Sequence, residues 1–80
     1  MQISTLWHAP KHAAVAIDAI ADNVTPMVLQ RLFDMGLEPG QTVLSLGRGP
    51  FNGPLVVQIN DRVFSIEQQV AQHIFVSTHS

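Results

Sequence analysis

The sequence predicts a mainly β fold: a small, partly open barrel of five strands, with a helix inserted after the first strand and a short helix before the last. Two observations carry this prediction. Short apolar runs recur along the chain and end at Gly, Pro or Asn, and one stretch of helical spacing interrupts them early. Several short strands separated by turns are typical of small barrels.

Three of the expected strands are single apolar runs. The segment 12–20 (HAAVAIDAI) places Val15 and Ile17 two residues apart, which favours a strand with one buried face. The segments 42–46 (TVLSL) and 74–76 (IFV) are short and rich in apolar residues. We therefore expect these three runs, in chain order, to be the first, second and fifth strands.

The segment 25–36 (TPMVLQRLFDMG) has the spacing of a helix. The Thr25 hydroxyl can cap the first turn, and Pro26 suits the first helical position because its missing N–H would be unpaired there anyway. Apolar residues recur on one side of this helix. The expected buried face comprises Leu29, Leu32 and Phe33, with Val28 beside them.

The stretch FDMGLEPG (33–40) predicts a helix stop followed at once by a reversal. Gly36 stands where a helix ends in a left-handed residue, and Leu37 can fold back on the last turn. Pro39 and Gly40 suit the two central positions of a type II turn. We expect Gly36, Leu37, Pro39 and Gly40 to be structural residues.

The segments 55–59 (LVVQI) and 62–66 (RVFSI) flank Asn60-Asp61 and predict a two-residue hairpin. In that register Val57 faces Phe64 and Leu55 faces Ile66 on the core side, while the other face is mixed. Ser65 and Gln68 have the spacing of a capping box, which predicts a short helix through about residue 73. This order of elements indicates an SH3-like barrel.

The composition excludes several classes of function. Eighty residues predict one domain (1–80), and the absence of cysteine excludes disulfides and thiolate metal sites. The formal charge is −2, and the four basic residues are scattered along the sequence, so we expect no nucleic-acid partner. No apolar run is long enough to span a membrane, and Asp18 interrupts the signal-like segment 13–21.

Motifs for ligands and catalysis are weak. The loop 47–53 (GRGPFNG) is followed by Pro54 and a strand, whereas a phosphate loop needs a helix there. His8 and His12 have metal-ligand spacing on a helix, but Pro10 lies between them. His73 and His79 stand alone. We therefore predict no catalytic residue, no cofactor and no specific metal site, and we do not expect an enzyme.

Two aromatic side chains have two interpretations each. Phe51 beside Arg48 either contacts a partner or folds inward to close one end of the barrel. Trp7 either packs over an open barrel end, which the small core favours, or contacts a partner.

The segment RLFDMGLEPGQTVLSL (31–46) resembles the Arg-Leu-x-x-Leu/Met-Gly-Leu-x-Pro-Gly-x-x-Val pattern of the FeoA family, and GPLVVQINDRVFSIEQQVAQHIFV (53–76) resembles the rest of that domain. The resemblance covers roughly residues 13–77. It implies an SH3-like barrel with an inserted helix. It also implies a cytoplasmic accessory protein of bacterial ferrous iron transport, which binds the cytoplasmic part of the membrane permease FeoB and modulates or supports it.

The chain departs from that pattern in two places. Many members have a Leu-Arg or similar basic step where this chain has Ile66-Glu67, and APKH (9–12) replaces a more usual proline-glycine turn.

The partner that the resemblance implies is FeoB, and a weak homo-oligomer is left open. The candidate contact residues are Arg31, Arg48, Phe51 and Asn52. The alternatives are a metal-responsive module that uses histidines and a peptide-binding SH3-like domain.

Overall fold

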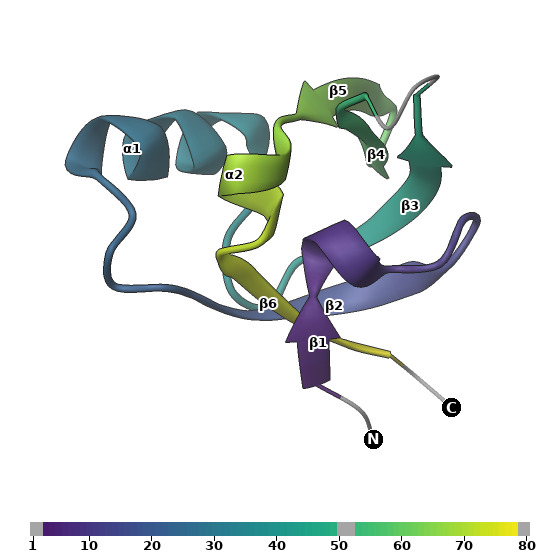
Figure 1. The fold of residues 1–80 in the computed structure, drawn as a ribbon, viewed down its shortest axis with the longest axis horizontal. Coiled ribbons are helices and arrows are strands. Elements are labelled where there is room, and N and C mark those ends of the chain that lie inside the picture. Colours follow the sequence, from purple (N-terminus) through teal and green to yellow (C-terminus); the bar gives the residue numbers. More distant parts are fainter. Residues whose placement is uncertain (1–2, 50–52, 79–80) are drawn as a thin grey trace.

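The protein is described here by a computed structural model that covers residues 3–49 and 53–78. Within these ranges six strands, two α-helices and one short 3-10 helix follow one another (Figure 1). In chain order they are β1 (Ile3–Thr5), η1 (Leu6–His8), β2 (Ala14–Ile20), α1 (Pro26–Met35), β3 (Thr42–Arg48), β4 (Leu55–Ile59), β5 (Arg62–Ile66), α2 (Gln68–Ala71) and β6 (Ile74–Thr78).

All strands belong to one antiparallel sheet in the order β1-β6-β2-β3-β4-β5. The predicted mainly β fold with an inserted helix is confirmed. The described residues form six strands rather than the predicted five, because Ile3–Thr5 pairs with β6 (Ile3 opposite Ser77). A three-residue strand whose partner lies at the other end of the chain leaves no local pattern to find.

The predicted helix stop is confirmed in detail. The Thr25 hydroxyl accepts a hydrogen bond from the amide of Val28 at 3.3 Å, and α1 ends at Met35. Gly36 has φ 93°, and the Leu37 amide donates to the Leu32 carbonyl at 2.8 Å. This is the Schellman arrangement, in which the chain reverses its hand and an apolar residue folds back onto the helix.

The turn after the helix also forms as predicted. The Gln41 amide donates to the Glu38 carbonyl at 3.1 Å, and Gly40, at the third position, has φ 94°. Gly40 donates to the Ile17 carbonyl and Gln41 accepts from the Ile17 amide, both at 2.9 Å. The turn is therefore attached to β2 and directs the chain into β3.

The β4–β5 hairpin has the predicted register, with Val57 opposite Phe64 and Leu55 opposite Ile66. Asn60 takes the left-handed conformation at φ 55°. Leu55, Val57 and Ile66 are buried and Phe64 is half-buried, so the predicted core face is correct.

Two predictions about the helices are wrong. Phe33 is 42% exposed rather than part of a buried face. The helix α1 lies at one side of the rolled sheet (Figure 1) and buries Leu32 fully. Met35 packs on the core instead of Phe33. The capping box does not form: Glu67 is the N-cap of α2 and makes no side-chain cap bond. Ser65 is still paired with Val56 inside β5, so sheet pairing prevails over the local helix signal.

One hydrophobic core fills the rolled sheet. Trp7 is only 4% exposed, which confirms that it packs against the core rather than projecting to a partner. Its 3-10 turn, which no sequence pattern predicted, places Leu6 and Trp7 over the sheet. The other fully buried large side chains include Val15, Ile17, Leu32, Leu37, Val43, Val57, Ile74 and Val76.

Candidate functional site

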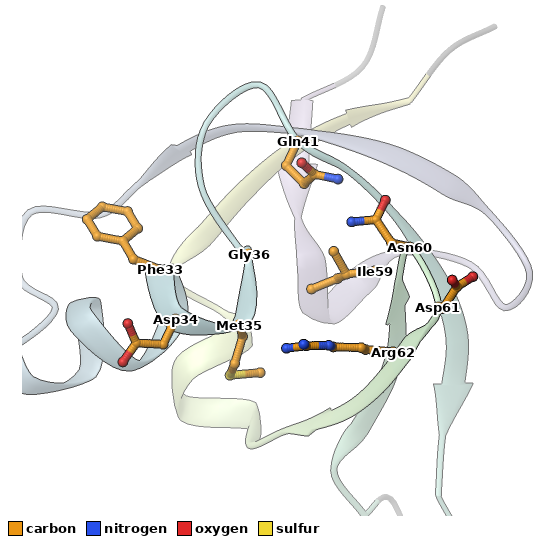
Figure 2. A pocket seen from close by; sticks show the side chains of 9 residues that line it. All are labelled: Phe33, Asp34, Met35, Gly36, Gln41, Ile59, Asn60, Asp61 and Arg62. Carbon is orange, nitrogen blue, oxygen red and sulfur yellow. The ribbon is translucent and has the colours of Figure 1, made fainter.

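A cleft of about 370 Å³ separates the end of α1 from the β4–β5 hairpin. We call it the hairpin cleft. Its lining residues are Phe33, Asp34, Met35, Gly36, Gln41, Ile59, Asn60, Asp61 and Arg62. Figure 2 shows the Arg62 side chain extended across the cleft toward Met35, with Ile59 above it, while Phe33 and Asp34 point away.

The shape of the hairpin cleft follows from the helix stop. Gly36 brings the end of α1 against Ile59, and a Cβ atom on residue 36 would lie 3.4 Å from the Ile59 Cγ2 atom. The cleft therefore has an apolar floor from Ile59 and Met35. Its rim carries both signs of charge, from Asp34, Asp61 and Arg62. Such a surface can hold an apolar side chain beside a charged one, as protein interfaces do.

A smaller cavity of about 180 Å³ lies between the start of α1 and α2. Its lining is mostly apolar and includes Val24, Val28 and Val70. His73 closes one side, and its Nδ1 atom lies 2.6 Å from the Gln69 carbonyl oxygen. This contact holds the imidazole within the local turn, and Asn23, Thr25 and Gln69 complete the lining.

At the other end of the barrel, Arg48 stacks on Trp7, with the guanidinium carbon 4.7 Å from the ring centroid. Lys11 packs against Gly47, next to Arg48 in the chain. We call Trp7, Lys11 and Arg48 the basic end. The basic residues are scattered in the sequence, but folding places the Lys11 stem against Gly47, the residue before Arg48. The signal was missed because the turn before β2 and the end of β3 meet only in the rolled sheet.

Two of the four predicted contact residues, Arg31 and Arg48, lie in the described structure, on different elements. Arg31 lies on α1, where a guanidinium nitrogen is 3.2 Å from a Glu67 carboxylate oxygen. Arg48 lies at the basic end. Phe51 and Asn52 lie outside the described residues. Glu67 belongs to one of the two positions where the sequence departs from the FeoA pattern. Its carboxylate is paired with Arg31 of the same chain.

The described part of the chain holds no group of three or more His, Asp or Glu side chains placed to bind a metal ion. The Nδ1 atom of His8 lies 2.8 Å from the Thr5 hydroxyl oxygen. His12 occupies a left-handed position with φ 66°, and His79 lies outside the described residues. Residues 3–49 and 53–78 also contain no helix long and apolar enough to cross a membrane.

Residues 4–78 match the family model of the FeoA domain. No curated protein matches the chain at a significant level. Among solved structures, iron(II) transport protein A from Clostridium thermocellum aligns with a TM-score of 0.83 and 22% identity, over 92% of this chain and 44% of that one. This chain therefore spans less than half the length of that protein.

Two further structures align over most of both chains. FeoA from Chlorobium tepidum has a TM-score of 0.85 and 24% identity, over 95% of this chain and 70% of that one. FeoA from Stenotrophomonas maltophilia, solved with zinc, has a TM-score of 0.77 and 27% identity, over 91% and 88% of the two chains. That protein is an SH3 domain protein and a candidate activating factor of ferrous iron transport. The chain therefore belongs to the FeoA domain family, which is associated with ferrous iron transport, and it has that family's SH3-like fold.

Proposed function

We propose that this chain is an accessory protein of bacterial ferrous iron transport. It binds the cytoplasmic part of a FeoB-type permease and modulates or supports that permease. The observation that carries the proposal is the FeoA domain match over residues 4–78, nearly the whole sequence. In this proposal the chain acts as a single domain in the cytoplasm, recruited to the inner face of the membrane by its partner.

The surface of the barrel supports an adaptor role. Met27 on α1 is 84% exposed, and Phe33 and Val63 are also exposed. Exposed apolar side chains near a cleft with charged rim groups are typical of interaction sites. The hairpin cleft, between Phe33 and the base of β5, offers such a site.

The proposed contact residues differ in availability. A partner that contacts Arg31 must compete with Glu67, although this exposed pair is worth less than about 1 kcal/mol. Arg48 has no acidic partner among the described residues. Phe51 and Asn52 follow it in the loop between β3 and β4 and remain proposed contacts.

A pull-down on the immobilised cytoplasmic domain of a FeoB permease tests this proposal. We expect the wild-type chain to be retained, and Arg48→Glu and Phe51→Ala to be retained less. Circular dichroism confirms that both variants fold. Absence of wild-type binding would contradict the proposed function. Unchanged binding by both folded variants would exclude the β3–β4 loop as the contact.

A metal-responsive role is the second candidate, and the zinc complex of the Stenotrophomonas relative favours it. Calorimetric titration with Zn²⁺ and Fe²⁺ tests it, since a specific site gives saturable heat at micromolar metal. A flat titration excludes it. The peptide-binding alternative has less support, because proline-rich ligands dock on exposed aromatic grooves, while this chain has no tyrosine and buries its only tryptophan.

A further inference from the structure

The basic end is built where the turn before β2 packs against the end of β3. The Ala13 amide donates to the Pro10 carbonyl at 3.2 Å, and the His12 amide donates to the Ser45 carbonyl at 2.6 Å. The first bond closes the turn before β2, and the second attaches this turn to β3. In Figure 1 this turn and the end of β3 lie on the same side of the molecule, away from α1.

Lys11 occupies space that a side chain on residue 47 would fill. A Cβ atom on Gly47 would lie 3.0 Å from the Lys11 Cγ atom. Gly47 has φ 94° and sits at the irregularity in the β3–β4 register. The glycine and the bulge therefore make room for the lysine stem, which packs against Gly47 while Lys11 as a whole stays exposed.

Arg48 is held by Trp7. Its guanidinium carbon lies 4.7 Å from the centroid of a ring that is itself buried, while Arg48 as a whole is exposed. This cation–π contact favours one position of the guanidinium, whose N–H donors form a planar fork. Less conformational entropy is then lost when those donors bind a ligand, and a planar fork of donors matches a carboxylate.

Within residues 3–49 and 53–78, neither Lys11 nor Arg48 forms an ion pair. The one ion pair among the described residues joins Arg31 to Glu67, and Arg62 lines the hairpin cleft with Asp34 and Asp61. Lys11 and Arg48 are the remaining cations. The other acidic residues, Asp18, Asp22 and Glu38, lie near the end of β2 or before β3, and the six steps of β3 separate its two ends by about 20 Å.

We propose that the basic end, Trp7 with Lys11 and Arg48, is the surface that binds an acidic, carboxylate-bearing segment of a protein partner. This inference rests on the proposed function where the partner is the permease. Lys11 and Arg48 lie at one end of the barrel and the acidic side chains lie elsewhere. An acidic surface therefore attracts the basic end first and orients the chain as it approaches. A membrane is a poorer match, because anionic lipid surfaces are recognised by clusters of several Lys and Arg residues and the basic end has two.

Binding of the FeoB cytoplasmic domain, measured by calorimetry at low and high salt, tests the surface. Lys11→Gln with Arg48→Gln removes both charges. Asp22→Asn is the control, since it also changes the charge of an exposed side chain but lies outside both the hairpin cleft and the basic end. We expect the double variant to bind at least about tenfold more weakly and with a smaller salt dependence, and the control to bind within about twofold of wild type. Equal losses in both, or no loss in the double variant, overturn the inference.

Arg48→Lys separates geometry from charge, because it keeps the cation and loses the planar fork. We expect intermediate affinity. Affinity equal to wild type would show that the stacked guanidinium has no special part, and would overturn that element of the inference. Thermal melts of all variants confirm the fold, and Lys11→Gln alone replaces the double variant if the loss of the Trp7 contact unfolds it.

A hexaglutamate peptide tests the surface without the permease. In an NMR titration of the whole chain, we expect saturable shifts of the Trp7 indole and of the amides of residues 11 and 48, lost in the double variant and kept in Asp22→Asn. If the wild-type chain fails to bind FeoB, the proposed function fails. This titration still tests whether the basic end binds an acidic peptide. No shifts, or shifts centred on Arg62, overturn it. Binding to phosphatidylglycerol vesicles but not to the peptide also overturns it, in favour of a lipid surface.

Discussion

Replacing Gly36 by valine tests the helix stop on which the fold depends. A non-glycine residue in the left-handed region costs roughly 1–2 kcal/mol, and a β-branched residue lies at the upper end of that range. Valine also restricts the unfolded chain more than glycine does, and this loss of unfolded-state entropy stabilises the folded variant by about 0.4–1 kcal/mol. A Cβ atom would lie 3.4 Å from the Ile59 Cγ2 atom, so the additional methyl groups of valine press toward a buried side chain. We expect a net loss of about 1–2 kcal/mol.

Urea unfolding followed by circular dichroism measures this loss, and a thermal melt should fall by roughly 5–15 °C for a domain of this size. Gly36→Asn should recover part of the loss, because asparagine tolerates the left-handed region better. Gly49→Ala is the matched control: Gly49 is not left-handed, and its Cβ atom would meet nothing closer than 3.9 Å. Equal stability of Gly36→Val and Gly49→Ala would refute the reasoning.

Three further predictions concern stability. Ser45→Ala should raise the free energy of unfolding by up to about 1 kcal/mol, because the buried Ser45 Oγ atom has no hydrogen-bond partner among the described residues; a loss in urea unfolding would contradict this. A double-mutant cycle on Arg31 and Glu67, which are 52% and 57% exposed, should give a coupling below about 1 kcal/mol that shrinks with salt, and a larger coupling would show that the pair is not simply solvated. His12→Val should cost about 1–2 kcal/mol while His12→Gly costs little, since φ is 66° there; similar melts for both would be inconsistent with the left-handed turn.

The fold could be predicted wherever local chemistry decides the conformation. The residues of α1 carry a cap and a helix stop within one stretch, and the β4–β5 hairpin has a turn and a clear core face, so both appeared with nearly correct bounds. β1 and η1 could not be predicted, because they form only when β6 and the core are in place. The short helix before β6 was predicted to start two residues too early, with Ser65 rather than Glu67 as its N-cap, since the pairing of Ser65 in β5 outweighs its capping tendency.

The candidate surfaces were harder to predict than the fold. The hairpin register placed Arg62 beside Ile59, so a cleft near the hairpin was within reach of sequence reasoning. Contact of Arg48 with Trp7 was not, because those residues are far apart in the chain and meet across the rolled sheet. Phe33 was assigned to the core by its spacing, yet spacing alone does not say how wide a stripe of the helix is covered.

Calorimetric titration of the whole wild-type chain into the purified cytoplasmic domain of a FeoB permease is the most direct test of the central claim. The account predicts saturable binding that weakens as salt is raised. Flat heats at every protein concentration and salt level would contradict an accessory role exercised through that domain.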